Sequence, residues 1–403
     1  MDALACCGPE GVALRLGGGV WVGMVTSCWL GLIADRWLLR MMISPSTFRD
    51  LVSGRRRGLG AALARLAMGA ASMPYGWAIR VRNRGYDRGA KEIYRPSVPV
   101  ISVGNLTVGG TGKTPMVEWL ARQLRQREIR VAILSRGYGA EQGGLNDEAL
   151  ELELSLPDVP HLQNPDRAAS SQIAVDELAT QLLLLDDGFQ HRKLARDFDL
   201  VLLDATEPFG FDHLLPRGTL REPVAGLRRA QAIVLSRADM IDARARGEVR
   251  ARAVRLAPQA VWAEVEHRPA ALIDSAGAVY PLAELRDQPV VAFCGIGNPA
   301  GFRHTLEGLG CRIERWREFP DHHDYTRENV DEIAGLIRES GARFAVCTRK
   351  DLVKLRVPAV GGASLRAVSV ELSFLYGEVE LKGALQPIID AAGDANDEMF
   401  GEA

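Results

Sequence analysis

Short apolar runs alternate with amphipathic stretches through most of the 403-residue chain, and this alternation predicts strands and helices in turn. The clearest run, Val98 to Val103, is followed by a polar loop and then by MVEWLARQL, whose apolar residues recur at helical spacing. Further strands are expected at 131–134, 181–185, 200–204 and 232–235. Strands alternating with helices are typical of a parallel sheet covered by helices. The pattern therefore predicts an α/β domain over residues 96–261.

The pattern changes near residue 262. Short alternating segments, VWAEVEH and ALIDSAGAVYPL, predict a small β linker over residues 262–287. A second series of elements, over residues 288–391, predicts a smaller α/β domain with strands at 290–297, 311–316 and 344–347 and helices at 300–309 and 326–340. At its end, VSVELSF and GEVELKG predict one hairpin. Residues 392–403 predict an acidic, disordered tail.

The first forty residues are apolar and glycine-rich. Gly17 to Ala34 carries no charge over 18 residues, which is the short end of a membrane span, and arginines follow it. One reading is a membrane anchor whose arginines keep the rest of the chain in the cytoplasm. Another is an extension upstream of a true start at Met41 or Met42. A cleaved signal peptide is a third reading and fits less well.

Residues 41–95 form a basic segment. Between Arg36 and Arg95 there are thirteen Lys and Arg residues against three Asp and Glu. Within the segment, residues 59–84 predict one helix and, after the break at Pro74, a second, with apolar side chains bordered by arginines. Such a segment suits an anionic membrane surface, and packing on the body of the protein is the alternative. Nucleic acid is not expected as a partner, because aromatic residues do not interleave with the basic ones.

The composition sets further bounds. With 47% hydrophobic and 25% charged residues, the chain is globular and long enough for two or three domains. Its net charge of −2 indicates no acidic partner by itself. The six cysteines form no C-x-x-C pair and have no histidine at metal-ligand spacing, so we expect buried free thiols and no zinc site.

The strongest chemical signal is the loop VGNLTVGGTGKTP between the first strand and its helix. Glycines let backbone N–H groups turn inward, and a helix N-terminus adds the positive end of its dipole, so this arrangement binds phosphates. Lys113 would reach the β- and γ-phosphates, and the Thr114 hydroxyl would bind Mg²⁺. The strict pattern needs a glycine at Thr107, so the loop fits better the variant G-G-x-G-K-[ST], in which Val108 replaces a frequent lysine.

Two carboxylates, Asp186 and Asp187, end the leucine-rich strand in QLLLLDDGFQH. Adjacent like charges repel, so a nearby cation is a physical reason to keep both. An aspartate at a strand end beside a phosphate loop typically holds Mg²⁺ or its water.

Three later segments carry further candidates. In LLPRGTLREP, Arg221 is a candidate for stabilising transferred phosphoryl charge and Glu222 for reaching the metal, with a surface ion pair as the alternative. In FPDHHDYT, two histidines beside aspartates suit metal binding, catalysis or a helix cap. SRAD, after the strand at 232–235, only loosely resembles the base-reading [NT]-K-x-D of GTPases, because Arg237 replaces the lysine.

Together, GNLTVGGTGKTP, SRGYG, DDGFQH, LLPRGTLREP, FPDHHDYT and TRKD occur in the order found in one family. From about Ser72 to about Leu385 the chain resembles the tetraacyldisaccharide 4'-kinases, the lipid A 4'-kinases of Gram-negative-type bacteria. The pairing of DDGFQH with this phosphate loop is highly specific to that family.

The resemblance implies a P-loop (Rossmann-like) α/β/α kinase domain and a smaller α/β/α domain, joined by the β linker. It also implies a basic N-terminal helix that docks on the inner membrane, at its cytoplasmic face. The reaction would move the γ-phosphoryl group of ATP, with Mg²⁺, to the 4'-hydroxyl of a tetraacyldisaccharide 1-phosphate lipid. No obligate protein partner is inferred.

Residue roles follow from the same resemblance. The nucleotide phosphates and Mg²⁺ would be held by Gly109, Gly110, Thr111, Gly112, Lys113 and Thr114. Asp186 and Asp187 match the family's paired aspartates at the metal, and Gln190 and His191 complete that motif on the nucleotide side. Arg221 and Glu222 match its Arg-Glu pair.

The base for the 4'-hydroxyl proton would be Asp147, the aspartate of the family's G-D-E segment. Here Asn146 replaces the preceding glycine. In the family a histidine from the second domain assists this aspartate, and His322 matches it better than His323. Such a histidine would orient the carboxylate when the domains close.

A different class of protein, a P-loop ATPase or GTPase acting as a switch at the membrane, would also explain the G-G-x-G-K-T loop and the paired aspartates. It would explain neither the apolar basic helix nor FPDHHDYT in the second domain. Label transfer from ATP to a lipid acceptor separates the two functions.

Overall fold

The structure, a computed structural model, describes residues 45–137, 147–321 and 323–400. The expectations for residues 1–40, the last two residues of the SRGYG loop and His322 fall outside this part of the chain. The chain divides into two units, one holding residues up to Arg82 together with Gly210–Arg221, and the other holding Asn83–Phe209 and Glu222–Ala403.

The first unit is built on helix α3 (Leu59–Asp87), which continues into the second unit, with α2 (Pro45–Val52) and the loop Gly210–Arg221. The expected break at Pro74 is wrong, because the helix runs through the proline. A proline removes only one backbone donor, and the surrounding Ala, Leu and Met residues favour helix. No described helix of the protein is long and apolar enough to cross a bilayer.

One face of α3 packs on the loop of its own unit. The Tyr75 hydroxyl donates to the Arg221 carbonyl (2.7 Å), and the Ser72 hydroxyl donates to the Leu214 carbonyl (3.1 Å). Gly76 is buried at this contact. A Cβ at this position would lie 2.8 Å from a Leu214 methyl group, so the close approach needs glycine. The loop is therefore tied to the middle of the helix.

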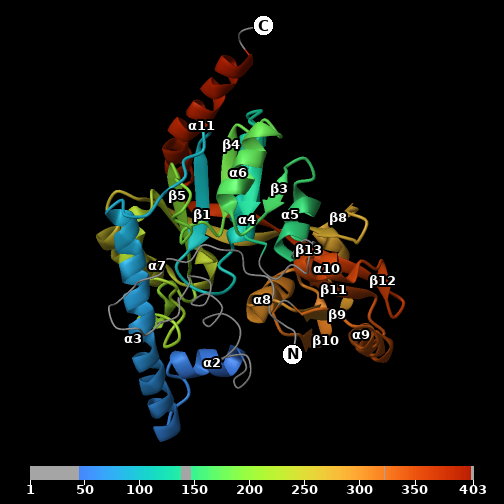
Figure 1. The fold of residues 1–403 in the computed structure, drawn as a ribbon. Helices are drawn as coiled ribbons and strands as arrows, with labels where there is room; N and C mark the ends of the chain where they lie inside the picture. Colours follow the sequence, from blue (N-terminus) through green and yellow to red (C-terminus); the bar gives the residue numbers. More distant parts are fainter. Residues whose placement is uncertain (1–44, 138–146, 322, 401–403) are drawn as a thin grey trace, which may run out of the picture. The chain divides into compact units, whose positions relative to one another are not determined.

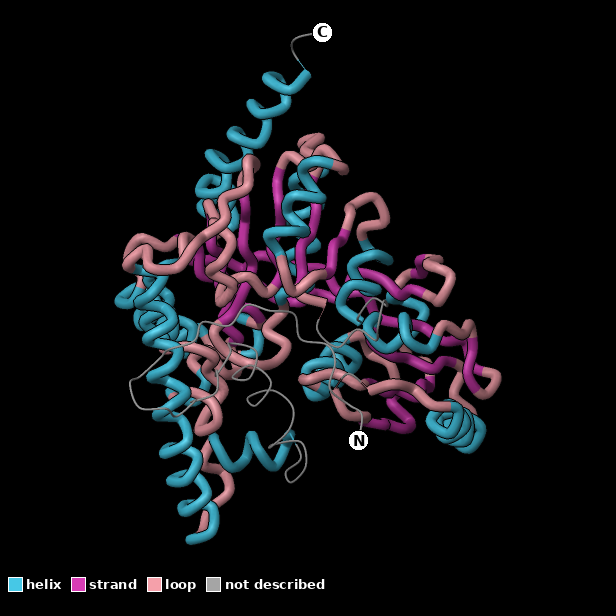
Figure 2. The backbone as a smooth tube through the Cα atoms, viewed as in Figure 1, coloured by secondary structure: helices cyan, strands magenta, loops and turns pink. Residues whose placement is uncertain are grey.

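The second unit contains one sheet. Its strands follow one another in the order β10-β9-β11-β13-β7-β6-β5-β1-β4-β2-β3, with β12 beside β13 and β8 beside β7 (Figures 1 and 2). The strands are β1 Val100–Asn105, β2 Val131–Ser135, β3 His161–Gln163, β4 Leu182–Asp186, β5 Phe198–Asp204, β6 Ala232–Ser236, β7 Val261–Ile273, β8 Val279–Tyr280, β9 Pro289–Cys294, β10 Arg312–Glu318, β11 Phe344–Thr348, β12 Ala359–Val360 and β13 Ala363–Tyr376. The helices of this unit are α4 Lys113–Arg125, α5 Asp147–Ser155, α6 Arg167–Asp176, α7 Ala243–Leu256, α8 Pro299–Gly308, α9 Arg327–Ser340, α10 Arg349–Leu355 and α11 Glu378–Phe400.

Each half of this sheet has an apolar core on both faces. Around β1, Ile101 and Val103 pack with α4 and α11 on one side, whereas Val100 and Leu183 pack with α6 on the other. Around β9 and β11, α9 and α10 cover one face and α8 the other. The expected fold class, two α/β/α layered halves with a P-loop in the first, is confirmed.

Strands β7 and β13 join the halves. β7 is parallel to β6, and β13 is antiparallel to β7 but parallel to β11. The carboxyl ends of the two parallel sets therefore point toward one another. Leu235, near the end of β6, pairs with Glu264 of β7. Thr348, at the end of β11, pairs with Val368 of β13, which pairs with Leu272 of β7. The carboxyl ends of the two parallel sets are therefore about 26 Å apart along β7.

The C-terminal segment corrects one expectation. GEVELKG does not form the second strand of a hairpin, because α11 begins at Glu378, directly after β13. Leu381, Leu385 and Ile389 recur at helical spacing and are buried on the α4 side of the first half. The backbone of α11 continues to Phe400, so much of the expected tail is helical.

Candidate active site

The phosphate loop connects β1 to α4, as the sequence predicts. Gly112 precedes the helix with φ 83°, a conformation that favours glycine. A Cβ at this position would lie 2.6 Å from the ring of His267, in the middle of β7, and 2.7 Å from the hydroxyl of Ser236, at the end of β6. Glycine is thus required twice here, by the backbone angle and by the space.

Polar side chains from neighbouring strands hold the loop in shape. The Asn105 amide donates to the Thr111 hydroxyl (2.9 Å), and the Arg237 guanidinium donates to the Gly110 carbonyl (2.6 Å). Arg237 is itself paired with Asp204 at the end of β5. These contacts turn carbonyls and hydroxyls toward the protein, which suits a loop whose N–H groups face phosphates.

Two aspartates follow β4, beside the loop. Asp186 is buried, and its backbone carbonyl accepts a hydrogen bond from the buried Arg167 (3.1 Å). Asp187 has φ 51°, and its carboxylate lies 3.4 Å from the Lys113 ammonium. The structure therefore brings Lys113 of the P-loop and the aspartate pair together.

Magnesium suits these residues. The carboxylates of Asp186 and Asp187 and the Thr114 hydroxyl at the start of α4 are the hard oxygen donors that Mg²⁺ prefers. Within the described residues, no group of three or more His, Cys, Asp or Glu side chains is arranged to hold a metal by itself. Mg²⁺ is usually bound through one or two carboxylates together with substrate phosphates.

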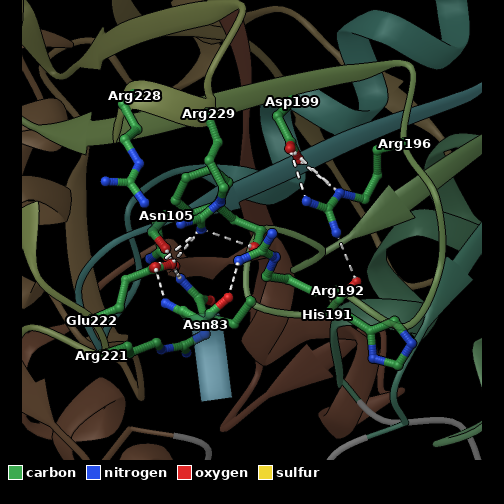
Figure 3. Close-up of polar contacts among 12 residues, drawn as sticks. Asn83, Asn105, His191, Arg192, Arg196, Asp199, Arg221, Glu222, Arg228 and Arg229 are labelled. Carbon is green, nitrogen blue, oxygen red and sulfur yellow. Dashed lines mark hydrogen bonds and ion pairs between the residues drawn. The ribbon is translucent and has the colours of Figure 1, made fainter. Parts of the chain in front are cut away.

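Glu222 lies in a buried polar cluster. Arg229 donates to both of its carboxylate oxygens (2.9 and 3.0 Å), and the amides of Gln190 and Asn83 donate to them at 3.0 and 3.3 Å. Figure 3 shows these contacts converging on Glu222 from Arg229 and Asn83. Gln190 also donates to the Asn105 carbonyl (2.8 Å), so the cluster is tied to the strand before the P-loop.

His191 stands in a basic environment. Burial, with Arg167 and Arg196 nearby, lowers its pKa to about 3, so the imidazole is neutral at pH 7. Arg196 forms an ion pair with Asp199 and donates to the His191 carbonyl (Figure 3). Burial likewise lowers the pKa of His267 to about 3. The neutral His267 ring beside Gly112 adds no charge to the loop that would repel a cation.

Arg221 belongs to the first unit, where its carbonyl accepts from Tyr75. Its proposed contact with the phosphates stays a prediction. His322 lies outside the described residues.

Asp147 begins α5, and its carboxylate forms an ion pair with Lys354 of α10 (2.6 Å). Lys354 also donates to the His323 carbonyl (2.9 Å). Asp147, from the first half, is thereby linked to the FPDHHDYT loop of the second.

That loop is itself well packed. The His323 ring stacks on Phe319, with ring centroids 4.7 Å apart, and contacts the Asn329 side chain (2.8 Å). The buried Asp351 accepts from the Tyr325 hydroxyl and the Gly295 N–H, both at 2.9 Å. Burial raises the pKa of the Asp351 carboxyl.

Sequence reasoning did not assign Arg237, His267 or Lys354. The first lies in SRAD and the third three residues beyond TRKD, so position after a strand end was the available signal. Their partners, Gly110, Gly112 and Asp147, are distant in the chain, and no local pattern names them.

Comparison with known proteins gives one consistent result. The family model described as tetraacyldisaccharide-1-P 4'-kinase matches residues 64–390. A tetraacyldisaccharide 4'-kinase of Anaeromyxobacter dehalogenans is 43% identical over 352 residues, which is 82% of this chain and 92% of the relative. Another, from Syntrophus aciditrophicus, is 37% identical over 340 residues, covering 77% and 88%.

A solved structure is also similar. The crystal structure of LpxK from Aquifex aeolicus in complex with ATP superimposes with a TM-score of 0.64 and 32% identity. The match covers 81% of this chain and 99% of that chain.

Proposed function

Because the chain belongs to the tetraacyldisaccharide 4'-kinase family, we infer that it is an ATP-dependent lipid kinase. It transfers the γ-phosphoryl group of ATP to the 4'-hydroxyl of a tetraacyldisaccharide 1-phosphate, a step of lipid A biosynthesis. The observation that supports this function most is that one unit holds both a P-loop and the ion-paired Asp147. In the same unit, the carboxyl ends of the two sets of parallel strands face each other.

The donor side uses the P-loop. Gly109 to Thr114 bind the phosphates through backbone N–H groups, and the Lys113 ammonium compensates the charge of the β- and γ-phosphates. Thr114, Asp186 and Asp187 would hold Mg²⁺, which would supply positive charge against the phosphates. Arg221 adds a second positive charge at the transferred group.

The contacts of Glu222 favour a supporting role over direct metal binding. Both of its oxygens already accept from Arg229, and it is fully buried. A buried carboxylate paired in this way is costly to separate from its partner. With Gln190, which joins it to Asn105, Glu222 holds the DDGFQH loop against β1, and His191 in that loop stays neutral at pH 7.

The acceptor side uses Asp147. Its carboxylate takes the proton of the 4'-hydroxyl as that oxygen attacks phosphorus, and His322 orients it. Phosphoryl transfer needs mainly positioning and charge stabilisation, so a correctly positioned base is sufficient for this reaction.

The membrane brings the acceptor. Apolar side chains lie along one exposed face of α3 at helical spacing: Leu59, Leu63, Leu66, Met73 and Trp77. Leu59 is 86% and Trp77 68% exposed, and exposed arginines at 55–57, 80 and 84 border this face. An apolar stripe with basic flanks suits the interface of an anionic membrane, so we place the protein at the cytoplasmic face of the inner membrane.

The test is transfer of label from γ-labelled ATP. Wild-type protein with Mg²⁺ and tetraacyldisaccharide 1-phosphate should place label in the lipid, and an analogue lacking the 4'-hydroxyl should receive none. Release of free phosphate alone, with either lipid, would instead identify a membrane ATPase switch and refute the kinase function.

A further inference from the structure

Helix α10 carries two cations that cross to the first half of the sheet. Arg349 contacts Glu118 of α4 (2.6 Å) and Glu151 of α5 (3.4 Å). One turn and a half later, Lys354 contacts Asp147 (2.6 Å) at the start of the same α5. Asp147 and Glu151 are four residues apart, so both project from one face of α5. The two cations therefore fix α5 at two points.

Lys354 does more than pair with a carboxylate. Its side chain is only 8% exposed, and Asp147 is 18% exposed, so water competes weakly for this contact. The same ammonium donates to the His323 carbonyl (2.9 Å). A Lys ammonium has three donors, and here two of them join Asp147 to the loop that carries the histidines.

Helix α10 is itself held firmly. The Thr348 hydroxyl and the Asp351 side chain form a reciprocal capping box at its start. Asp351 also accepts from Gly295 and Tyr325, which ties the helix to the loops after β9 and β10. The Lys354 ammonium thus extends from a rigid base rather than from a free helix end.

We propose that Lys354 is a positioning residue for Asp147 in phosphoryl transfer. It fixes the direction of the carboxylate and its distance from the histidine loop, so that the base meets the acceptor hydroxyl in a single geometry. Lys354, which follows the TRKD segment, thereby allows the second half of the sheet to position the base, Asp147. This inference rests on the role proposed above for Asp147.

The alternative is a purely structural ion pair. Loss of that pair would lower stability without changing the chemistry of the folded enzyme. The two roles differ in kcat, in the response to arginine, and in coupling to Asp147.

The experiment measures lipid phosphorylation by full-length wild type, Lys354→Met, Lys354→Arg and the control Lys382→Met, whose lysine forms an exposed pair with Glu378 on α11. We expect Lys354→Met to lower kcat about 10²-fold, while KM for ATP stays within about twofold. Lys354→Arg should recover most of this loss, and the control should match wild type. A Lys354→Met enzyme with wild-type kcat, or an arginine variant no better than the methionine variant, would overturn the proposal.

A double variant guards against a folding defect. Asp147→Asn/Lys354→Met leaves no unpaired buried charge, so it should fold even where Lys354→Met does not. If Lys354 acts through Asp147, the double variant transfers phosphate at the rate of Asp147→Asn alone. A further drop of about 10²-fold would show that Lys354 acts elsewhere and would overturn the proposal.

The wild-type control separates the two levels of inference. Wild-type protein that places no label in the lipid refutes the proposed function and this inference with it. Active wild type with an equally active Lys354→Met refutes the positioning role alone.

Discussion

The two edges that face each other across the sheet are built by different means. The phosphate edge, after β1, β4 and β6, depends on backbone conformation. Gly112 has φ 83°, and Arg237 and Asn105 hold a carbonyl and a hydroxyl of the loop in place. The opposite edge, after β9, β10 and β11, depends on side-chain contacts. Here Arg349, Lys354 and Asp351 form the ion pairs and hydrogen bonds that join helices and loops.

The difference follows from what each edge must do. Phosphates are uniform ligands that backbone N–H groups satisfy, so a short contiguous motif is enough. A base must instead be aimed at one hydroxyl, and this requires side chains brought from distant parts of the chain. The phosphate edge should therefore be sensitive to added atoms, and the opposite edge to removed charges.

The largest effect is expected where a buried charge on the opposite edge is removed. Arg349→Met leaves Glu118 and Glu151 without their shared cation and should lower the free energy of unfolding by about 3 to 5 kcal/mol. Urea unfolding measures it. The control Arg244→Met breaks an exposed pair with Glu248 and should cost at most about 1 kcal/mol. Equal losses in both would contradict the importance of this cluster.

Next comes the one side-chain charge of the P-loop. Lys113→Ala should lower kcat/KM for lipid phosphorylation by about 10²- to 10³-fold, because the ammonium near Asp187 would no longer compensate phosphate charge. Its unfolding midpoint should stay near that of wild type. A variant that unfolds like wild type and keeps full activity would remove Lys113 from the site.

An added methyl group should act on the phosphate edge. Gly112→Ala places a Cβ against His267 and Ser236 and forces alanine to φ 83°, which alone costs about 1 to 2 kcal/mol. We expect weaker ATP binding by calorimetry. Gly308→Ala is the matched control, because a Cβ there meets nothing within 4 Å. Unchanged ATP affinity in Gly112→Ala would argue against the observed loop conformation.

The last effect concerns pH and is measured as a change in stability per pH unit. Burial lowers the pKa of His161 to about 4, so the unfolded chain, where histidine titrates near 6.5, binds the proton first. Stability from this group is complete above pH 6.5 and falls by up to about 1.4 kcal/mol per pH unit from 6.5 down to about 4. His161→Gln should flatten that slope in urea unfolding at pH 6.5, 5.5 and 4.5. A His161→Gln slope equal to that of wild type would contradict the prediction.

The same contrast explains what could be predicted from the sequence. The strands and most helices were predictable because each buries a local apolar pattern, and the P-loop because its glycines are contiguous. The alternation in GEVELKG led to the wrong prediction of a strand. Leu381 and Leu385 are spaced as on one face of a helix, and burying that face against the first half favours helix α11.

The supports of the site were not predictable in this way. Arg237 and Lys354 act on Gly110 and Asp147, and only the fold brings these pairs together. An isolated lysine after TRKD has the same local sequence whether it faces solvent or a carboxylate. The antiparallel pairing of β7 and β13, which sets the two edges face to face, likewise depends on long-range contact.

The central claim is that the P-loop binds ATP and that Asp147 serves only the transfer step. The variant Asp147→Asn tests this claim most directly. ATP affinity is measured by calorimetry and phosphoryl transfer by single-turnover labelling of tetraacyldisaccharide 1-phosphate at saturating ATP and Mg²⁺. We predict an ATP Kd within about twofold of wild type and a transfer rate lowered by about 10²- to 10⁴-fold. Transfer at the wild-type rate would contradict the account, because the base would then lie elsewhere.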